Sequence, residues 1–177
     1  MLATEQRKGL SRRDLLRTSG AATIVVLAGA IVHPGEGWGL EAQGLSPETM
    51  RTLVKLARDT YPHDRLPDRF YAVALKPFDA QAAGDPAFKG LLEDGVVALD
   101  ELAVARHGVA YVEVGWEADR VALIGEIEDS SFFQKVRSSL VTGLYNNEEV
   151  WPIFGYEGSS ADKGGYIHRG FDDIAWL

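Results

Sequence analysis

Apolar residues recur at the spacing of a helix through most of the chain after residue 45. In each pattern they return every three or four positions and so form one face, the signature of an amphipathic helix. Five such segments are separated by short breaks, and they cover about residues 46–61, 67–83, 85–108, 117–127 and 131–145. No rhythm of alternating strands and helices appears. The pattern therefore predicts a mainly all-α fold, a compact bundle of about five helices.

Start and stop signals support these boundaries. Ser46-Pro47 and Asp85-Pro86 each place a side chain that can cap a helix before a proline suited to its first position. Gly108 follows a basic turn and predicts a helix end. Pro77 lies inside the second pattern, so we expect a kink or a split there.

One short segment has strand-like content. Residues 109–114 read Val-Ala-Tyr-Val-Glu-Val, between the third and fourth helical patterns. A lone strand cannot satisfy its backbone hydrogen bonds, and no second strand is predicted in the helical region. We therefore expect an extended connector at this position.

The last part of the chain, residues 146–177, combines aromatic side chains with many glycines. Glycine at this density does not support a long amphipathic helix. Ordering such a tail requires burial of its aromatic rings, either on its own domain or on a partner. The sequence leaves both open. Because aromatic rings and arginine dominate interface hot spots, the candidate partner-contacting residues are Trp151, Phe154, Tyr156, Tyr166, Arg169, Phe171 and Trp176.

Residues 1–42 have the character of an export signal and linker. Residues 1–34 carry a net charge of +3, which leaves −11 on the rest of the chain. The uncharged run over residues 21–32 is shorter than the ~20 apolar residues that a membrane-spanning helix needs. A basic head before a short apolar segment is typical of a signal peptide. We expect an N-terminal signal helix, followed by a helical domain over 43–145 and the tail over 146–177.

The basic head resembles a twin-arginine translocation signal. Arg12 and Arg13 stand together, and Leu15 and Leu16 follow after one residue, with Arg17 as the trailing basic residue. This pathway exports folded proteins and is usual for those that acquire a cofactor or a partner in the cytoplasm. Neither a cleavage site nor retention of the segment as an anchor is decided by the sequence.

The chemistry of the side chains excludes several classes of site. The chain contains no cysteine, which excludes disulfides, zinc–thiolate and iron–sulfur sites and covalent attachment of c-type haem. The four histidines show no pair at ligand spacing, and no nucleotide-binding or hydrolase motif occurs. The net charge of −8 argues against nucleic acid as a partner. We therefore expect no cofactor-binding, metal-binding or catalytic residue in this chain.

The chain resembles the gluconate 2-dehydrogenase subunit 3 family, the small subunits of bacterial membrane-associated flavin dehydrogenases. The resemblance rests on the twin-arginine head and on Tyr145-Asn146-Asn147, Val150-Trp151, Gly155-Tyr156-x-Gly158 and Gly164-Gly165-Tyr166. It implies a non-catalytic periplasmic subunit that supports the export and stability of a large subunit of the glucose–methanol–choline (GMC) oxidoreductase type. That large subunit holds FAD and oxidises a sugar, sugar acid or glycoside, and a cytochrome c subunit with haem often accepts the electrons. The translocase would be a partner during export.

The segment 109–116 departs from this resemblance, because relatives are usually polar there, and it is a candidate subunit contact. Two other functions stay open. One is an independent periplasmic sugar-binding or enzymatic domain with a site lined by Trp151, Tyr156, Tyr166 and His168, since sugars stack on aromatic rings. The other is a membrane-anchored assembly factor that retains residues 21–32.

Overall fold

The computed structural model describes residues 26–27, 30–31, 42–169 and 171. Contacts between Cα atoms divide the chain into two units, residues 1–39 and residues 40–177. In the first unit, strand β1 (Val26–Leu27) pairs antiparallel with strand β2 (Ala30–Ile31), with Val26 opposite Ile31. These four residues therefore form strands where the sequence predicts a signal helix, and the β-branched Val26 and Ile31 suit this pairing. The rest of that predicted helix, including Arg12, Arg13, Leu15 and Leu16, lies outside the described residues.

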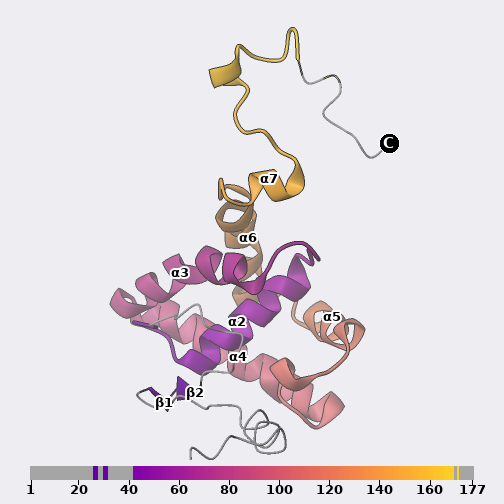
Figure 1. Ribbon diagram of the computed structural model, residues 1–177. Coiled ribbons are helices and arrows are strands. Elements are labelled where there is room, and N and C mark those ends of the chain that lie inside the picture. Colours follow the sequence, from indigo (N-terminus) through magenta and orange to yellow (C-terminus); the bar gives the residue numbers. More distant parts are fainter. Residues whose placement is uncertain (1–25, 28–29, 32–41, 170, 172–177) are drawn as a thin grey trace, which may run out of the picture. The chain divides into compact units, whose positions relative to one another are not determined.

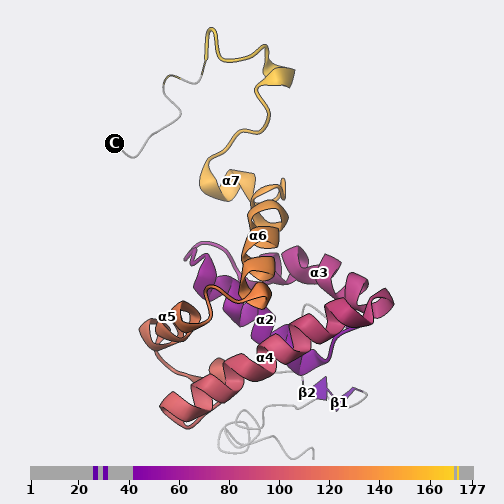
Figure 2. The same ribbon diagram turned by 180° about the vertical axis from the view of Figure 1, so that it is seen from behind.

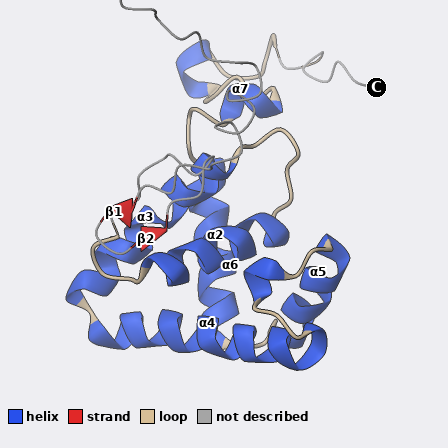
Figure 3. Ribbon diagram, turned by 60° about the horizontal axis from the view of Figure 1, so that its bottom comes forward, coloured by secondary structure: helices blue, strands red, loops and turns tan. Residues whose placement is uncertain are grey.

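The described residues of the second unit form five long helices, as the sequence predicts. Figures 1 and 3 show these helices as a bundle, and the described residues after 145 form short elements. The long helices are α2 (Pro47–Thr60), α3 (Asp68–Gly84), α4 (Pro86–His107), α5 (Glu117–Glu126) and α6 (Ser131–Tyr145). The short elements are η1 (Tyr111–Glu113), α7 (Trp151–Phe154) and η2 (Ala161–Lys163). The all-α bundle is thereby confirmed.

The helix ends follow from local side-chain chemistry. Ser46 Oγ accepts a hydrogen bond from the Thr49 backbone N at 3.0 Å and so begins α2. Asp85 Oδ1 accepts from two amides of the first turn of α4, at 3.1 and 3.0 Å. At the other end of α4, Gly108 has φ 75°, a left-handed conformation that glycine adopts without strain. These are the start and stop residues that the sequence predicts.

Two local predictions need correction. At Pro77 the sequence predicts a kink or a split, and the split does not occur, because α3 runs without interruption through this residue. Leu75 and Phe78, on either side of the proline, are both buried in the core, and this packing holds the helix together. The connector after α4 is also not fully extended. Residues 111–113 form the 3-10 turn η1, because Tyr111 folds inward and is completely buried.

Helix α3 packs against α2, α4 and α6 (Figure 2), and α2 packs against all four other long helices. Small residues allow α6 to cross closely over α4 and over α3. A Cβ atom on Gly95 would lie 2.2 Å from the ring of Phe132, so α6 can approach α4 only because position 95 lacks a side chain. A Cβ atom on Gly143 would lie 3.0 Å from the Ala74 carbonyl oxygen. The bundle therefore depends on glycine at defined crossing points.

A buried ion pair joins α2, η1 and α5. Arg120 donates to both carboxylate oxygens of Asp59, from Nε at 2.7 Å and from Nη2 at 3.0 Å. Tyr111 Oη donates to Asp59 Oδ2 at 2.8 Å, and all three residues are buried. Burial and the neighbouring carboxylate raise the pKa of Tyr111, so its hydroxyl stays a donor. The Arg120 guanidinium and the Tyr111 hydroxyl together offset the free-energy cost of burying the charged Asp59 carboxylate in the core.

Another carboxylate fixes the chain at the entry to α2. Asp79 of α3 accepts hydrogen bonds from the backbone N of Gln43, Gly44 and Leu45 at 2.8, 3.0 and 2.9 Å. Burial alone would raise the pKa of Asp79, but these three donors outweigh it, and the pKa lies below its ordinary value. The segment 43–45 is thus held on the middle of α3 by one side chain.

Replacing Asp79 by asparagine should release this segment. The protection of the Leu45 amide from hydrogen exchange should fall, and the free energy of unfolding should decrease by about 1–3 kcal/mol. Because the folded pKa is lowered, the stabilisation by Asp79 is complete above about pH 4 and is lost as the pH falls through the folded value. In the Asp79→Asn variant, the free energy of unfolding should therefore decrease less steeply as the pH falls. Asp94→Asn on the exposed surface of α4 is the control, and an equal effect there would contradict this role for Asp79.

Candidate partner interface

The first turn of the tail packs on the helical bundle. Val150 is completely buried, and the indole Nε1 of Trp151 donates a hydrogen bond to the Tyr145 carbonyl oxygen at 2.8 Å. Helix α7 then ends at Gly155, which has φ 75°. The sequence left open whether the tail packs on its own domain, and for this first part it does.

An aromatic cluster around His63 receives α7. His63 lies in the turn between α2 and α3, and its ring centroid is 4.8 Å from that of Phe154. His63 Nε2 and Tyr145 Oη share a hydrogen bond of 2.7 Å, and Tyr61 packs edge-on against Tyr145 at 5.9 Å. Burial raises the pKa of Tyr145, so its hydroxyl can donate to the neutral imidazole. His63 thus links the first interhelical turn to the root of the tail.

Attachment of α7 should depend on pH. Burial and the nearby Arg58 guanidinium lower the pKa of His63, so the folded state favours the neutral ring. The stabilisation by His63 is present above the ordinary histidine value of about 6.5 and is lost as the pH falls through the lower folded value. The protection factors of the Phe154 and Tyr156 amides should therefore be several-fold lower at pH 5.5 than at pH 7.5.

The matched variants for this test are His63→Gln and His107→Gln. His107 lies exposed in the last turn of α4 and should leave the pH dependence intact, whereas His63→Gln should remove it. Protection factors in the unmodified protein that are equal at both pH values would show that His63 does not control the attachment.

Beyond α7 the tail exposes its apolar side chains to solvent. Between 46 and 78% of the surface of each of four residues is accessible: Tyr156, Tyr166, Ile167 and Phe171. The hydrogen bonds found within 159–169 stay inside the tail, as in the bond from Gly165 N to Ser160 O at 2.8 Å. Gly158, Gly164 and Gly165 all have positive φ and set its turns. Because these uncovered side chains are concentrated in one short segment, we treat the segment as the candidate contact surface for a partner.

Three charged side chains of the tail, Glu157, Lys163 and Arg169, are paired with one another. Glu157 accepts hydrogen bonds from both Lys163 and Arg169, and Lys163 also donates to the Glu157 carbonyl oxygen. Arg169 was a candidate partner contact, but its guanidinium is already bound to Glu157. Beside these paired charges, the described tail exposes the aromatic and aliphatic side chains of Tyr166, Ile167 and Phe171.

The predicted interface residues other than Arg169 fall into three groups. Trp151 and Phe154 pack against the bundle, and the Trp151 ring contacts Tyr156 edge-on at 5.2 Å. Tyr166 and Phe171 are exposed, and Trp176 lies outside the described residues. The sequence did not single out His63, because a lone histidine in a turn carries no spacing signal; only its proximity to Tyr145 identifies it.

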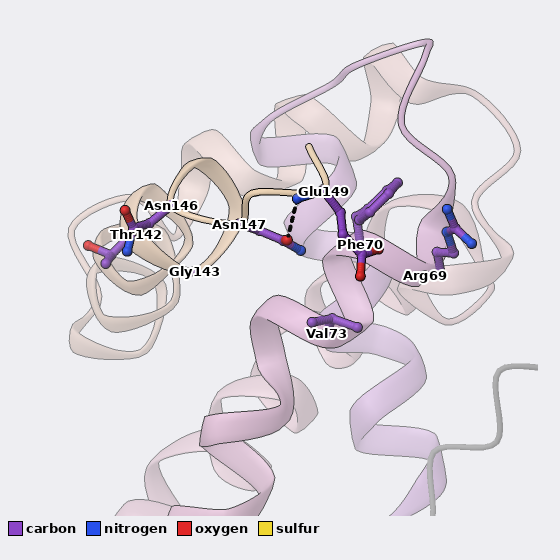
Figure 4. A pocket seen from close by; sticks show the side chains of 8 residues that line it. All are labelled: Arg69, Phe70, Val73, Thr142, Gly143, Asn146, Asn147 and Glu149. Carbon is purple, nitrogen blue, oxygen red and sulfur yellow. Dashed lines mark hydrogen bonds between the residues drawn. The ribbon is translucent and has the colours of Figure 1, made fainter. Parts of the chain in front are cut away.

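A shallow pocket of about 450 Å³ lies between α3 and the end of α6 (Figure 4). Arg69 stacks over the Phe70 ring at 4.7 Å, and the Glu149 amide donates to Asn147 Oδ1 at 3.0 Å. The lining residues are Arg69, Phe70, Val73, Thr142, Gly143, Asn146, Asn147 and Glu149. None of the four aromatic and histidine residues proposed for a sugar site lines this pocket.

Neither a metal site nor a membrane-spanning helix is found in the part of the chain that the structure describes. The described residues contain no group of three or more potential metal ligands. Within the same residues, no helix is long and apolar enough to cross a membrane. Comparison of the chain with protein-family models, with curated proteins and with solved structures found no match.

Proposed function

We propose that the chain is the non-catalytic small subunit of a periplasmic, FAD-dependent dehydrogenase complex. Its large subunit would be a GMC-type flavoprotein that oxidises CH–OH groups of a sugar, sugar acid or glycoside, and a cytochrome c subunit with haem would complete complexes of this kind. The small subunit would carry the export signal, assist folding of the large subunit and stabilise it afterwards. The complex would work in the periplasm, at the inner membrane.

The exposed tail is the observation that carries this proposal. Three apolar side chains, those of Tyr166, Ile167 and Phe171, lie uncovered after α7. Glu157, Lys163 and Arg169 of the same segment pair with one another. Burying such groups is worth about 25 cal/mol per Å² of apolar surface, so a protein surface that covers them gains substantial free energy. A protein partner accounts for the tail better than a sugar ligand, because Trp151 and Tyr156 already pack on each other. We expect an interface of more than ~1,000 Å² in which the tail is prominent.

The amino-terminal segment supports export together with a folded passenger. The paired arginines precede a short apolar run, and the rest of the chain holds no motif for a cofactor of its own. A chain without its own cofactor benefits from a route that exports folded proteins if it is exported together with a partner subunit that contains a cofactor. In this proposal FAD is bound in the cytoplasm by the large subunit, which then travels with the small one.

Replacing Arg12 and Arg13 by lysine tests the export role. The variant should leave the dehydrogenase activity of the partner in the cytoplasm, while the amounts of both polypeptides stay similar. The measurement is dye-coupled dehydrogenase activity in separated periplasmic and cytoplasmic fractions. Arg7→Lys, outside the paired motif, is the matched control. Unchanged periplasmic activity in the double variant would contradict the proposal.

A further inference from the structure

Trp116 is the most exposed tryptophan of the described residues. It lies immediately before α5, and 77% of its surface is accessible to solvent. Among the described residues, its indole makes no hydrogen bond to a partner and no ring contact, although its backbone oxygen accepts from Arg120 N at 3.2 Å. A large apolar ring in water is costly, and tryptophan is among the residues most enriched at the centre of interfaces.

The backbone under Trp116 is held rigidly by the buried ion pair. Arg120 Nη1 donates to the carbonyl oxygens of Val114 and Gly115 at 2.7 and 3.2 Å. The same guanidinium is bound to Asp59 of α2, and Val114 is buried in the core. The indole is therefore presented from a preorganised base and not from a free loop, which lowers the entropic cost of binding.

The charges around Trp116 define the chemistry of what could cover it. Glu113 stands three residues before Trp116 and Glu117 directly after it. Both are exposed, and neither forms an ion pair among the described residues. Arg120, in the first turn of α5, is already bound to Asp59. The helix dipole explains an acidic residue in the first turn of α5 but not an uncovered indole. Anionic lipid and nucleic acid would be repelled, so the complementary surface is an apolar pocket of a protein, bordered by lysine or arginine.

We infer that Trp116 and its acidic border form a second docking surface, which inserts into a cation-bordered apolar pocket of the same flavoprotein subunit that the tail binds. This inference rests on the proposed function for the identity of the partner. It assigns a role to the segment 109–116, in which Tyr111 and Val114 face the core and Trp116 faces solvent.

Site-specific photo-crosslinking in the co-expressed complex tests this surface. Single substitutions by p-benzoylphenylalanine are made at Trp116, at Tyr166 in the tail and at Val97, an exposed position of α4 that serves as control. We expect adducts with the flavoprotein at 116 and 166 but not at 97, and the 116 adduct should map to a peptide that contains lysine or arginine. In parallel, Trp116→Ala should raise the Kd for the flavoprotein at least tenfold, and Glu113→Gln with Glu117→Gln should weaken the salt dependence of binding.

The outcomes separate the two proposals. Adducts at 166 without an adduct at 116 would overturn the second surface and leave the proposed function standing. An adduct of 116 with another polypeptide or with lipid, or equal yields at 116 and 97, would also overturn it. Failure to crosslink a flavoprotein at either 116 or 166 would overturn both proposals.

Discussion

Replacing Asp59 by alanine is expected to lower the free energy of unfolding by about 3–5 kcal/mol, the largest effect that we expect for a single substitution. The side chain is buried, and its removal leaves the Arg120 guanidinium and the Tyr111 hydroxyl without their acceptor. An uncompensated charge in the core costs far more than the ion pair contributes when complete. Chemical denaturation followed by circular dichroism measures this change directly.

An exposed ion pair in the same protein is the control for Asp59. Arg106 and Glu126 join the end of α4 to α5 at 2.8 Å, and both side chains are largely accessible to water. Arg106→Ala should therefore change the free energy of unfolding by no more than about 1 kcal/mol. Tyr111→Phe, which removes a single donor, should cost about 1 kcal/mol. Equal losses for Asp59→Ala and Arg106→Ala would show that the buried pair does not join the three elements.

Ending the chain after Gly158 should abolish stable binding of the flavoprotein without unfolding the bundle. This truncation removes Tyr166, Ile167 and Phe171, which are exposed, and retains α7 with the buried Val150. We expect the Kd to rise at least about 100-fold, equivalent to about 2.7 kcal/mol, while the thermal midpoint stays within about 2 °C. Binding is measured with the purified flavoprotein subunit, and the midpoint by calorimetry.

A larger deletion, which leaves a shorter chain, separates binding from stability. Ending the chain after Tyr145 also deletes Val150 and Trp151, which pack on the bundle, so this variant should lose thermal stability as well. If the variant that ends at Gly158 still binds the flavoprotein with unchanged affinity, the main interface lies on the helices and the tail has another role.

The helices were predictable because their signals are local. Ser46 with Pro47 and Asp85 with Pro86 begin α2 and α4 at the expected positions, and Gly108 ends α4. The helix over 67–83 was also predictable, but whether Pro77 would divide it was not, since a local rule does not include the burial of Leu75 and Phe78. Boundaries set by caps could thus be predicted, and the continuity of a helix through a proline could not.

The long-range polar contacts were invisible in the sequence. Asp59 and Arg120 are 61 residues apart, and His63 and Tyr145 are 82 residues apart. In a pattern of apolar and polar positions, a buried charged residue looks like one on a solvated face. The aromatic tail was recognised as a unit, but its division into a docked turn and an exposed remainder depends on His63, which no spacing rule connects to it.

Purification of the tagged full-length chain, co-expressed with the proteins of its own organism, tests the central claim most directly. We predict that a second, larger polypeptide co-purifies in a fixed ratio, with the absorption spectrum of oxidised flavin and with dehydrogenase activity toward a sugar or sugar acid. The small chain separated from it should have neither flavin nor activity. A chain that purifies alone without flavin, or that oxidises a sugar by itself, would contradict the account.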